Sequence, residues 1–446
     1  MSMRRILGLG AMLAFAAAAG GLQAQAGGPG TGPHPDLPPP DVSWIPTVEV
    51  GEAVGWQAGE APVAAPGFMV NAFARNLAHP RWLYVLPNGD VLVAETAAPP
   101  TPEEYEDGGL RAWFVGRFMK KAGAAVASAD RITLLRDRDG DGQAEVQETF
   151  VDGLYSPFGM ALVGDRFFVA NADAVVEFAY VPDATHLAGP PRHLAALPAG
   201  RNHHWTKSLV AAADGRTLYV GVGSNSNIGE NGMAEEQQRA AILAIDTTTG
   251  ASRVFASGLR NPVGLDWNPA TGELWTAVNE RDELGDDLVP DYMTSVRQGD
   301  FFGWPWSYFG AHADPRVEQR PDLVATARVP DYALGAHTAS LGLAFYTGRR
   351  FAERYQGGAF VGQHGSWNRR PPAGYRVVFV PFSGGRPSGD VEPVLTGFLD
   401  EEEGVAHGRP VGVAVAADGA LLIADDVGNV VWRVSPTVGH APAARR

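Results

Sequence analysis

A strand–turn–strand unit that recurs along the chain is the feature that most limits its fold. Units of this kind begin at His79, Ser156, His204, Asn261, Thr338 and Arg409. In most of them a turn such as Asn88-Gly89 or Asp418-Gly419 separates two apolar runs, and Gly tolerates the positive φ of a tight hairpin. Repetition of a hairpin-sized unit every roughly 50–75 residues is typical of a β-propeller, in which each unit forms one blade. We therefore expect an all-β fold, a six-bladed β-propeller over residues 61–436.

Two segments interrupt this regular pattern. Residues 310–335 are irregular, which leaves five or seven blades open as alternatives. Residues 97–128 break the repeat and predict an inserted loop with one short helix, which in a propeller would lie at one face and wall the central pocket. A β-sandwich is the alternative architecture, but it does not predict the same loop–strand–turn–strand order six times.

Composition narrows the classes of partner. The 446 residues include 55 Gly and 34 Pro, which fits many tight turns between short strands. The net charge of −15 argues against a nucleic-acid partner and against an anionic membrane surface. The chain has no cysteine, which excludes disulfides, thiolate metal sites and a covalently attached c-type haem.

The N-terminal residues 1–26 have the pattern of a signal peptide. Arg4 and Arg5 precede an apolar stretch rich in Ala and Gly, and Ala24-Gln25-Ala26 provides a cleavage site. The stretch is too short for a transmembrane helix and no later apolar run replaces it, so we expect no membrane span and a periplasmic or secreted protein. An uncleaved anchor is the alternative. Residues 27–60 form a Pro/Gly-rich N-terminal segment, and residues 437–446 are expected to be a disordered tail.

The segment DRDGDGQAEVQE, residues 137–148, has the ligand order of a calcium loop. Such a loop needs oxygen ligands at positions one, three, five, seven, nine and twelve and a Gly at six, because Ca²⁺ takes six to eight oxygens. These positions are filled by Asp137, Asp139, Asp141, the backbone carbonyl of Gln143, Glu145 and Glu148, with Gly142 at six. The flanking residues are strand-like, so we expect a structural Ca²⁺ site in a hairpin. The alternative is a solvated acidic turn.

The stretch from residue 258 to residue 308 concentrates polar loops between apolar runs. It contains GLRNPVGLDW, AVNERDELGDD and GDFFGWPWSY. An arginine in the first motif could hold an anion, and the acidic turn in the second could offer carbonyls or carboxylates to a cation. This combination points to a charged cofactor and a metal.

Histidines mark two further loops. His203 and His204 lie just before a predicted strand, and a neutral imidazole can accept a hydroxyl proton at physiological pH. GQHGSWNRR, residues 362–370, adds His364 and Arg369 on another unit. The alternatives are a structural histidine pair in the first loop and a plain polar loop in the second.

These motifs resemble the glucose/sorbosone dehydrogenases, soluble quinoproteins that use pyrroloquinoline quinone (PQQ) and Ca²⁺ on a six-bladed propeller. The resemblance covers about residues 65–435 and is greatest to the sorbosone dehydrogenase branch. Its most specific pieces are GLRNPVGL, NERDELGDD, FFGWP and RPVGVAVAADG.

The resemblance implies roles for individual residues. His204 takes the place of the general base, with His203 as its neighbour, and Arg260 and Asn261 take the place of the residues that contact the quinone and the substrate side. Arg409 occupies the position of an arginine that binds a cofactor carboxylate. The backbone carbonyls that hold the catalytic Ca²⁺ map to Glu280 and Arg281.

The chain also departs from the family pattern. Glu280-Arg281 stands where the glucose-oxidising members have Gly-Pro, and Val411 replaces their second cofactor-binding arginine. Their quinone-binding lysine has no clear counterpart, and His364 or Arg369 is the candidate for its place.

The resemblance therefore implies an enzyme that oxidises an aldose, sorbosone or a related sugar or alcohol by hydride transfer to the quinone. His204 would remove the hydroxyl proton, Arg260 would stabilise the negative charge on the quinone oxygen, and an external quinone or cytochrome would accept the electrons. The alternatives are a calcium-dependent propeller lactonase and a non-catalytic propeller that binds a partner.

Overall fold

The structure is a computed structural model that describes residues 30–42, 47–105 and 110–437. The signal peptide expected at residues 1–26 lies outside the described residues, as does the expected tail beyond residue 437.

Strands account for nearly all of the regular structure, which confirms the expected all-β class. The helices of the described ranges are short: α1 (Leu110–Lys121), α2 (Pro321–Val324), and the 3₁₀ turns η1 (Glu103–Tyr105), η2 (Met233–Glu236) and η3 (Glu353–Tyr355). None of them combines the length and the apolar character that crossing a bilayer requires.

Six antiparallel sheets of four or five strands make up the body of the molecule, and we number them in chain order. Sheet 1 contains β5 (Pro80–Val85), β6 (Val91–Glu95), β7 (Arg131–Arg136) and β8 (Val146–Val151). Sheet 2 contains β9 (Met160–Val163), β10 (Arg166–Ala170), β11 (Ala174–Ala179) and β12 (Arg192–Ala196). Sheet 3 contains β13 (Leu209–Ala211), β14 (Thr217–Val222), β15 (Ala241–Asp246) and β16 (Ser252–Ser257).

The other three sheets add strands from the N-terminal part of the chain. Sheet 4 contains β17 (Pro262–Trp267), β18 (Leu274–Val278), β19 (Pro290–Val296), β22 (Tyr332–Ala336) and β1 (Thr31–Gly32). Sheet 5 contains β23 (Ser340–Phe345), β24 (Ala359–Gln363), β25 (Arg376–Val380), β28 (Glu392–Thr396) and β3 (Val63–Ala64). Sheet 6 contains β31 (Pro410–Val415), β32 (Leu421–Asp425), β33 (Val430–Pro436) and β4 (Phe68–Ala74).

Short strands form three small additional sheets. They are β2 (Glu52–Ala53) with β30 (Val405–Ala406) and β29 (Leu399–Asp400), β20 (Ser307–Tyr308) with β21 (His312–Ala313), and β26 (Phe382–Ser383) with β27 (Arg386–Pro387). The pair β20–β21 and the helix α2 lie in the connection from β19 to β22, which is the stretch that looked irregular in the sequence.

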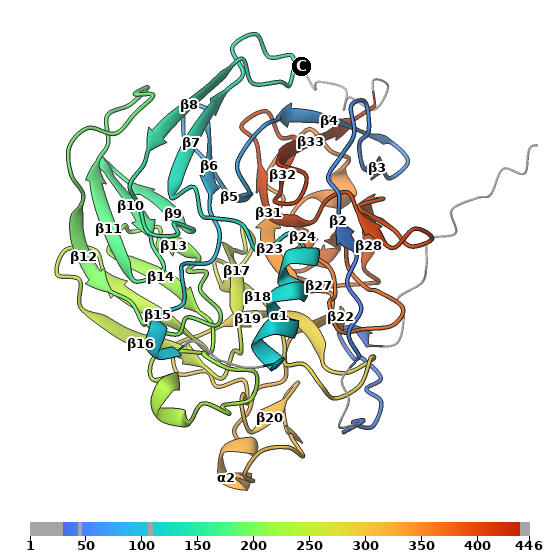
Figure 1. Ribbon diagram of the computed structural model, residues 1–446. Helices are drawn as coiled ribbons and strands as arrows, with labels where there is room; N and C mark the ends of the chain where they lie inside the picture. Colours follow the sequence, from blue (N-terminus) through green and yellow to red (C-terminus); the bar gives the residue numbers. More distant parts are fainter. Residues whose placement is uncertain (1–29, 43–46, 106–109, 438–446) are drawn as a thin grey trace, which may run out of the picture.

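The six sheets form a closed ring. The first strand of each sheet contacts the first strand of the next, in the order β5, β9, β13, β17, β23, β31 and back to β5. Figure 1 shows the sheets fanned around the middle of the molecule. Sheet 6 is built from both ends of the described chain, because β4 pairs with β33.

Apolar side chains fill the space between every two successive sheets. Alternate residues of a strand point to opposite faces, so a strand buried on both faces contributes to two clusters. In β32, Leu421 and Ile423 pack towards sheet 5, whereas Leu422 and Ala424 pack towards sheet 1. Six such clusters close the ring, one between each pair of neighbouring sheets.

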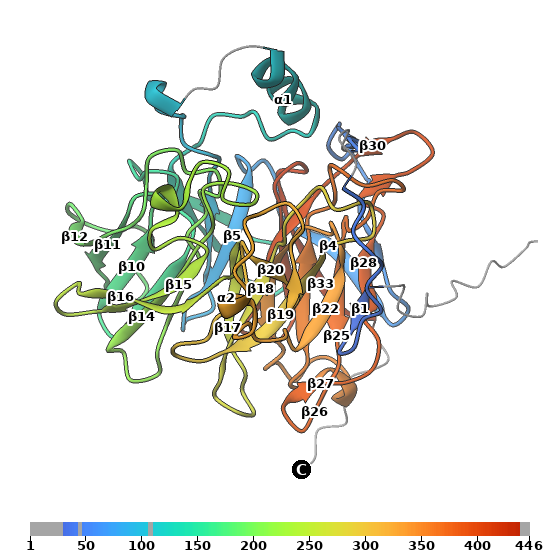
Figure 2. The same ribbon diagram turned by 90° about the horizontal axis from the view of Figure 1, so that it is seen from below.

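The topology gives the ring two different ends. The residues that precede the first strand of each sheet and the loops that join its second and third strands lie at one end, which we call the upper end after its position in Figure 2. The insert between β6 and β7 carries α1 and rises above this end (Figure 2). This agrees with the inserted loop and short helix expected between residues 97 and 128.

Candidate functional site

Most of the residues singled out in the sequence lie at the upper end of the ring. His204, Arg260 and Arg409 each come shortly before the first strand of a sheet, namely β13, β17 and β31. His364 follows β24, in a loop between second and third strands. Because all these loops lie at one end of a closed ring, residues far apart in sequence meet there.

Arg260 is buried and fully engaged with polar partners. Its Nη1 donates to the carbonyl oxygen of Glu280 at 2.7 Å, and its Nη2 lies 3.0 Å from Asp282 Oδ2 and 3.1 Å from Asn227 Oδ1. Its side chain is only 2% exposed. Burying a guanidinium requires a counter-charge, and Asp282 supplies it.

Asp282 gathers several donors, and we call Arg260, Asp282, His337 and Asn368 the Asp282 cluster. Asp282 Oδ1 lies 2.9 Å from Asn368 Nδ2 and 3.4 Å from His337 Nδ1. Burial alone would raise the pKa of Asp282, but Arg260 and His337 hold this pKa well below its ordinary value. Burial would lower the pKa of His337, yet its contact with Asp282 raises it. In this cluster the ionised Asp282 carboxylate balances the charge of Arg260 and holds its guanidinium in a fixed position.

Glu280 and Arg281, whose backbone carbonyls were predicted to hold a catalytic Ca²⁺, have other contacts in this structure. The carbonyl oxygen of Glu280 already accepts the 2.7 Å hydrogen bond from Arg260, and a guanidinium repels a cation at the same oxygen. Burial raises the pKa of the Glu280 carboxyl to about 7. The Arg281 side chain lies 2.9 Å from Asp314 Oδ2. As arranged here, these residues do not fit Ca²⁺ at the Glu280 carbonyl.

A second carboxylate, Asp426, gathers side chains from sheets 1, 5 and 6, and we call this group the Asp426 cluster. Asp426 Oδ2 lies 2.7 Å from Arg81 Nη1, 2.9 Å from His364 Nε2 and 3.5 Å from His79 Nε2. Burial would raise the pKa of Asp426, but these three neighbours keep it far below its ordinary value. Burial lowers the pKa of His364 to about 4, so His364 is neutral at physiological pH.

Arg409 lies beside the Asp426 cluster and adds a second guanidinium. Its Nη1 is 3.5 Å from His364 Nδ1, and its Nη2 donates to Tyr375 Oη at 2.6 Å. The Nε atoms of Arg409 and Arg81 are both buried and find no hydrogen-bond partner in the described part of the chain.

The guanidiniums of Arg81 and Arg409 therefore each keep a buried Nε–H without an acceptor among the described residues. Buried donors without acceptors are costly, and an anionic ligand could supply the acceptors. These residues fit a group that carries carboxylates. The structure thus brings His364 and Arg409 together, and it adds Arg81, His79 and Asp426, which the sequence analysis missed.

Arg369 and Val411 lie apart from this group. Arg369 donates to Asp286 O at 2.8 Å and pairs with Asp287 Oδ1 at 2.7 Å, so its guanidinium is bound to the acidic turn after β18. Val411 is fully buried and packs in the core between sheets 1 and 2. Neither side chain is placed to support Arg409.

His204 and Asn261 meet over Gly223. A Cβ on Gly223 would lie 2.3 Å from Asn261 Oδ1 and 2.4 Å from the Cβ of His204, so a side chain at Gly223 would displace both residues. His204 Nδ1 lies 2.9 Å from Ser224 O and 3.1 Å from Ser224 Oγ. Burial, followed by the nearby charge of Arg260, keeps the pKa of His204 well below its ordinary value.

His203 stacks edge-on against His204, with ring centroids 4.7 Å apart. Its side chain is exposed to water, yet surrounding protein lowers its pKa by desolvation, which is the environment of a concave surface. The structure therefore brings His203, His204, Arg260 and Asn261 into one neighbourhood.

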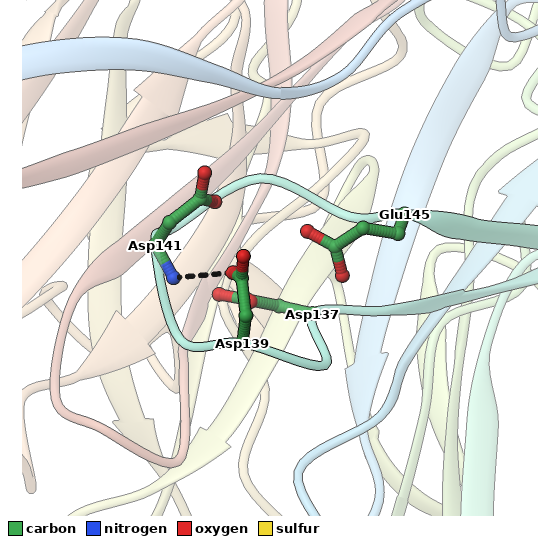
Figure 3. Close-up of side chains that lie close together, drawn as sticks. All are labelled: Asp137, Asp139, Asp141 and Glu145. Atoms are coloured by element: carbon green, nitrogen blue, oxygen red, sulfur yellow. Dashed lines mark hydrogen bonds between the residues drawn. The ribbon is translucent and has the colours of Figure 1, made fainter.

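The acidic loop at the lower end of the ring forms a separate group. Oxygen atoms of Asp137, Asp139, Asp141 and Glu145 all lie within 4.8 Å of one another (Figure 3). Backbone N–H groups shape the loop: Gly140 and Gly142 donate to the Asp137 carboxylate at 2.7 and 2.9 Å, and Gln143 donates to Asp141 at 2.8 Å.

Glu148 does not join this group of carboxylates. It lies in β8 opposite Leu134, as part of the regular ladder between β7 and β8. Glu145, at loop position nine, supplies the fourth carboxylate of the group.

The chain matches two family profiles and is similar to several known proteins. A family profile described as "Domain of unknown function (DUF7133)" matches residues 62–366, and a profile described as "TrAA12-like" matches residues 313–437. An uncharacterized protein of Borreliella burgdorferi is 28% identical over 298 residues, which cover 64% of this chain and 77% of that protein.

A curated enzyme is among the relatives. The pyrroloquinoline quinone-dependent pyranose dehydrogenase of Coprinopsis cinerea is 26% identical over 339 residues, which cover 62% of this chain and 45% of that enzyme. The chain thus spans less than half the length of this relative. The solved PQQ domain of the Coprinopsis cinerea pyranose dehydrogenase shares the fold at a TM-score of 0.68, with 21% identity, 86% of this chain covered and 100% of that domain. PQQ-dependent pyranose and aldose sugar dehydrogenases therefore stand among the homologues and structural neighbours.

Proposed function

The chain belongs to the DUF7133 family, and from this membership and the geometry of the upper end we propose that it is a PQQ-dependent oxidoreductase acting on a sugar or related alcohol. The observation that carries the proposal is the pair Arg81 and Arg409, whose Nε–H donors are buried and unused in the described part of the chain, close to Asp426. PQQ is a tricarboxylate, and such a ligand would supply the missing acceptors. The pyrroloquinoline quinone-dependent pyranose dehydrogenase among the homologues supports this choice of anion.

The proposed architecture is a six-bladed β-propeller. Six sheets whose first strands close a ring, with one apolar cluster between each neighbouring pair, support it. In this arrangement the upper end carries the cofactor, and residues in or next to sheets 1, 3, 4, 5 and 6 contribute to it.

Individual residues at the upper end then have the following proposed roles. Arg409 and Arg81 would hold cofactor carboxylates, with His364 packed between Arg409 and Asp426 in the place of the family's lysine. Asn261 would contact the cofactor or the substrate through its buried and unpartnered Oδ1. The bound quinone supplies the two-electron acceptor that no side chain provides.

We assign removal of the substrate hydroxyl proton to His204. Its lowered pKa keeps the imidazole neutral at physiological pH, so it can accept the proton of a substrate hydroxyl. Arg260, fixed by Asp282 and Asn227, keeps a positive charge next to His204 and favours negative charge developing in this region.

For calcium we propose the acidic loop of Asp137, Asp139, Asp141 and Glu145 as a structural site. Its oxygen-only ligands and exposed position suit a hard cation. A cation at the Glu280 carbonyl would first require Arg260 to leave that oxygen, so no chemical role is assigned to calcium there.

The remaining parts of the proposal rest on the sequence. The substrate class is an aldose, sorbosone or a related sugar or alcohol, and an external quinone or cytochrome accepts the electrons. The pattern of residues 1–26 supports export to the periplasm or the medium.

The test is a titration of the purified protein with PQQ, followed by absorbance, and then dye reduction with a panel of sugars. Saturable binding and sugar-dependent dye reduction are expected. Arg409→Gln should weaken PQQ binding by roughly 10- to 100-fold, because a hydrogen bond to a charged group contributes about 1.5–3 kcal/mol. Arg320→Gln, which alters an exposed pair with Asp322, is the matched control and should leave binding unchanged.

A second variant separates the enzyme from its alternatives. His204→Ala should bind PQQ normally and lose turnover by roughly 10²–10⁴-fold. Absence of saturable PQQ binding would reject the proposal. Calcium-dependent lactone hydrolysis in its place would favour the lactonase, and neither activity would favour the binding module.

A further inference from the structure

The contact between His204 and the turn after β14 decides which ring nitrogen carries the proton. His204 Nδ1 lies 2.9 Å from the carbonyl oxygen of Ser224 and 3.1 Å from the hydroxyl oxygen of Ser224. Both atoms belong to one residue of the turn, and both approach the same ring nitrogen.

Neither of these two oxygens has a hydrogen to give. A carbonyl oxygen only accepts. The hydroxyl of Ser224 has a single hydrogen, which it donates to the carbonyl oxygen of Ser226 at 2.6 Å. Because both partners can only accept, Nδ1 must be the donor. A neutral imidazole carries one N–H, so its Nε2 keeps the lone pair.

We infer that Ser224 is a positioning residue that holds His204 in the tautomer with the proton on Nδ1 and leaves Nε2 as the proton acceptor. The inference deepens the proposed function, since it rests on that function for what Nε2 does. The tautomer itself follows from the contacts alone.

A buried carboxylate holds the turn in place. Glu236, which is 5% exposed, accepts a hydrogen bond from the Ser226 hydroxyl and another from the Asn225 backbone N–H at 2.8 Å. Asn225 Oδ1 in turn accepts from the backbone N–H of His203 at 3.2 Å. Glu236 thus fixes both the turn that carries Ser224 and the loop that carries the histidines, and it acts as a second positioning residue.

The support behind His204 is uncharged. In the described part of the chain, Nδ1 meets only the two oxygens of Ser224. The charged and titratable groups that act on the ring are Arg260, His203 and Arg239, and each of them lowers the pKa of His204. A carboxylate in the place of Ser224 would act in the opposite direction.

The first experiment reads the tautomer directly in the protein without cofactor. Two-bond ¹H–¹⁵N spectra of ¹⁵N-histidine-labelled protein at neutral pH distinguish a protonated from an unprotonated ring nitrogen, and His204→Asn identifies the His204 signals by their loss. The expected result is a protonated Nδ1 and an unprotonated Nε2. The reverse tautomer would overturn the inference, whatever the protein oxidises. The expected tautomer in a protein that binds no PQQ would count against the proposed function alone.

The second experiment compares Ser224→Asp with Ser224→Ala in the loaded enzyme and in the same spectra. A carboxylate within about 4–6 Å raises a neighbouring pKa by roughly 1–3, so Ser224→Asp should move the acid limb of kcat/KM, and the titration of His204, to higher pH. Ser224→Ala keeps the carbonyl acceptor and should lower kcat/KM by only about fivefold, the value of one neutral hydrogen bond, without moving the limb. An acid limb that does not move in Ser224→Asp would contradict the contact.

Glu236 has a matched control next to it. Glu235 is exposed, whereas Glu236 is buried. Glu236→Gln should change the His204 signals towards a mixture of tautomers, and Glu235→Gln should leave them as in the parent protein. Unchanged His204 signals in Glu236→Gln would remove Glu236 from the inference.

Discussion

At the lower end of the ring, Asp137, Asp139 and Asp141 lie at or near the surface and accept hydrogen bonds mainly from backbone N–H groups. At the upper end, Asp282 and Asp426 are enclosed, and they accept from arginine and histidine side chains. The same functional group is therefore embedded in two opposite electrostatic settings.

The difference follows from solvation. An exposed carboxylate keeps its hydration, so several can stand close together without arginine partners, and together they attract a cation. A buried carboxylate must be paired with a cation or held by several hydrogen bonds, and Asp282 and Asp426 are paired with arginines. At the upper end, Arg81 and Arg409 lie around Asp426, and their Nε–H donors have no acceptor within the described ranges. This contrast is the basis for proposing a metal ion at one end of the ring and an anion at the other.

Removing a carboxylate should have its largest effect at the upper end. Asp426→Asn leaves Arg81 buried without its counter-charge, and breaking a buried pair in this way costs about 3–5 kcal/mol of stability. Urea unfolding of the parent protein and of Asp426→Asn measures this loss in the free energy of unfolding.

Asp139→Asn in calcium-free buffer is the comparison for this variant. Its effect should stay within about 0.5 kcal/mol, as for other surface substitutions. Equal losses from the two variants would show that the two ends do not differ as described.

Lowering the pH should also act through the upper end. Burial lowers the pKa of His364 to about 4, below its ordinary value of 6.5. The unfolded chain therefore binds this proton first as the pH falls, so the contribution of His364 to stability declines between about pH 6.5 and pH 4, by about 2–4 kcal/mol in total. His364→Asn should flatten this part of the curve of unfolding free energy against pH. A curve with the same slope in the variant would assign the effect to other groups.

Calcium should act through the lower end and by a smaller amount. A ligand at 100 times its dissociation constant stabilises the folded state by about 2.7 kcal/mol. Thermal unfolding with calcium and with a chelator should differ accordingly in the parent protein, and this difference should disappear in Asp139→Asn. A calcium effect that survives in Asp139→Asn would place the ion elsewhere.

Much of the fold could be predicted from the sequence because hairpins are local. The units starting at His79, Ser156 and His204 each became one sheet, and Gly89 of the predicted turn Asn88-Gly89 has a positive φ. The fourth strand of sheet 6 could not be predicted in this way. It is β4, which pairs with β33 more than three hundred residues later, and no local pattern specifies such a pairing.

The location of candidate residues at the upper end was predictable where a motif precedes a strand, as for His204, Arg260 and Arg409. Asp282 and Asp426 were not singled out, because partners such as His337 and Arg81 come from other sheets and leave no spacing to read. The same repeat would have indicated His79 and His337, since each comes just before the first strand of its sheet. Arg369 shows the converse error: it is five residues from His364 in sequence, but its guanidinium is bound to Asp286 and Asp287.

The pairing of β4 with β33 has a consequence for the order of folding. During synthesis β4 emerges early, but the strand that completes its hydrogen bonds is among the last residues to appear. Until then sheets 1 and 5 each lack the neighbour that covers one of their apolar faces. Bringing β4 and β33 together across this sequence separation costs loop-closure entropy. Only the contacts of the complete six-sheet ring offset this cost. The molecule can acquire its final stability only in one late step, after nearly the whole chain is available.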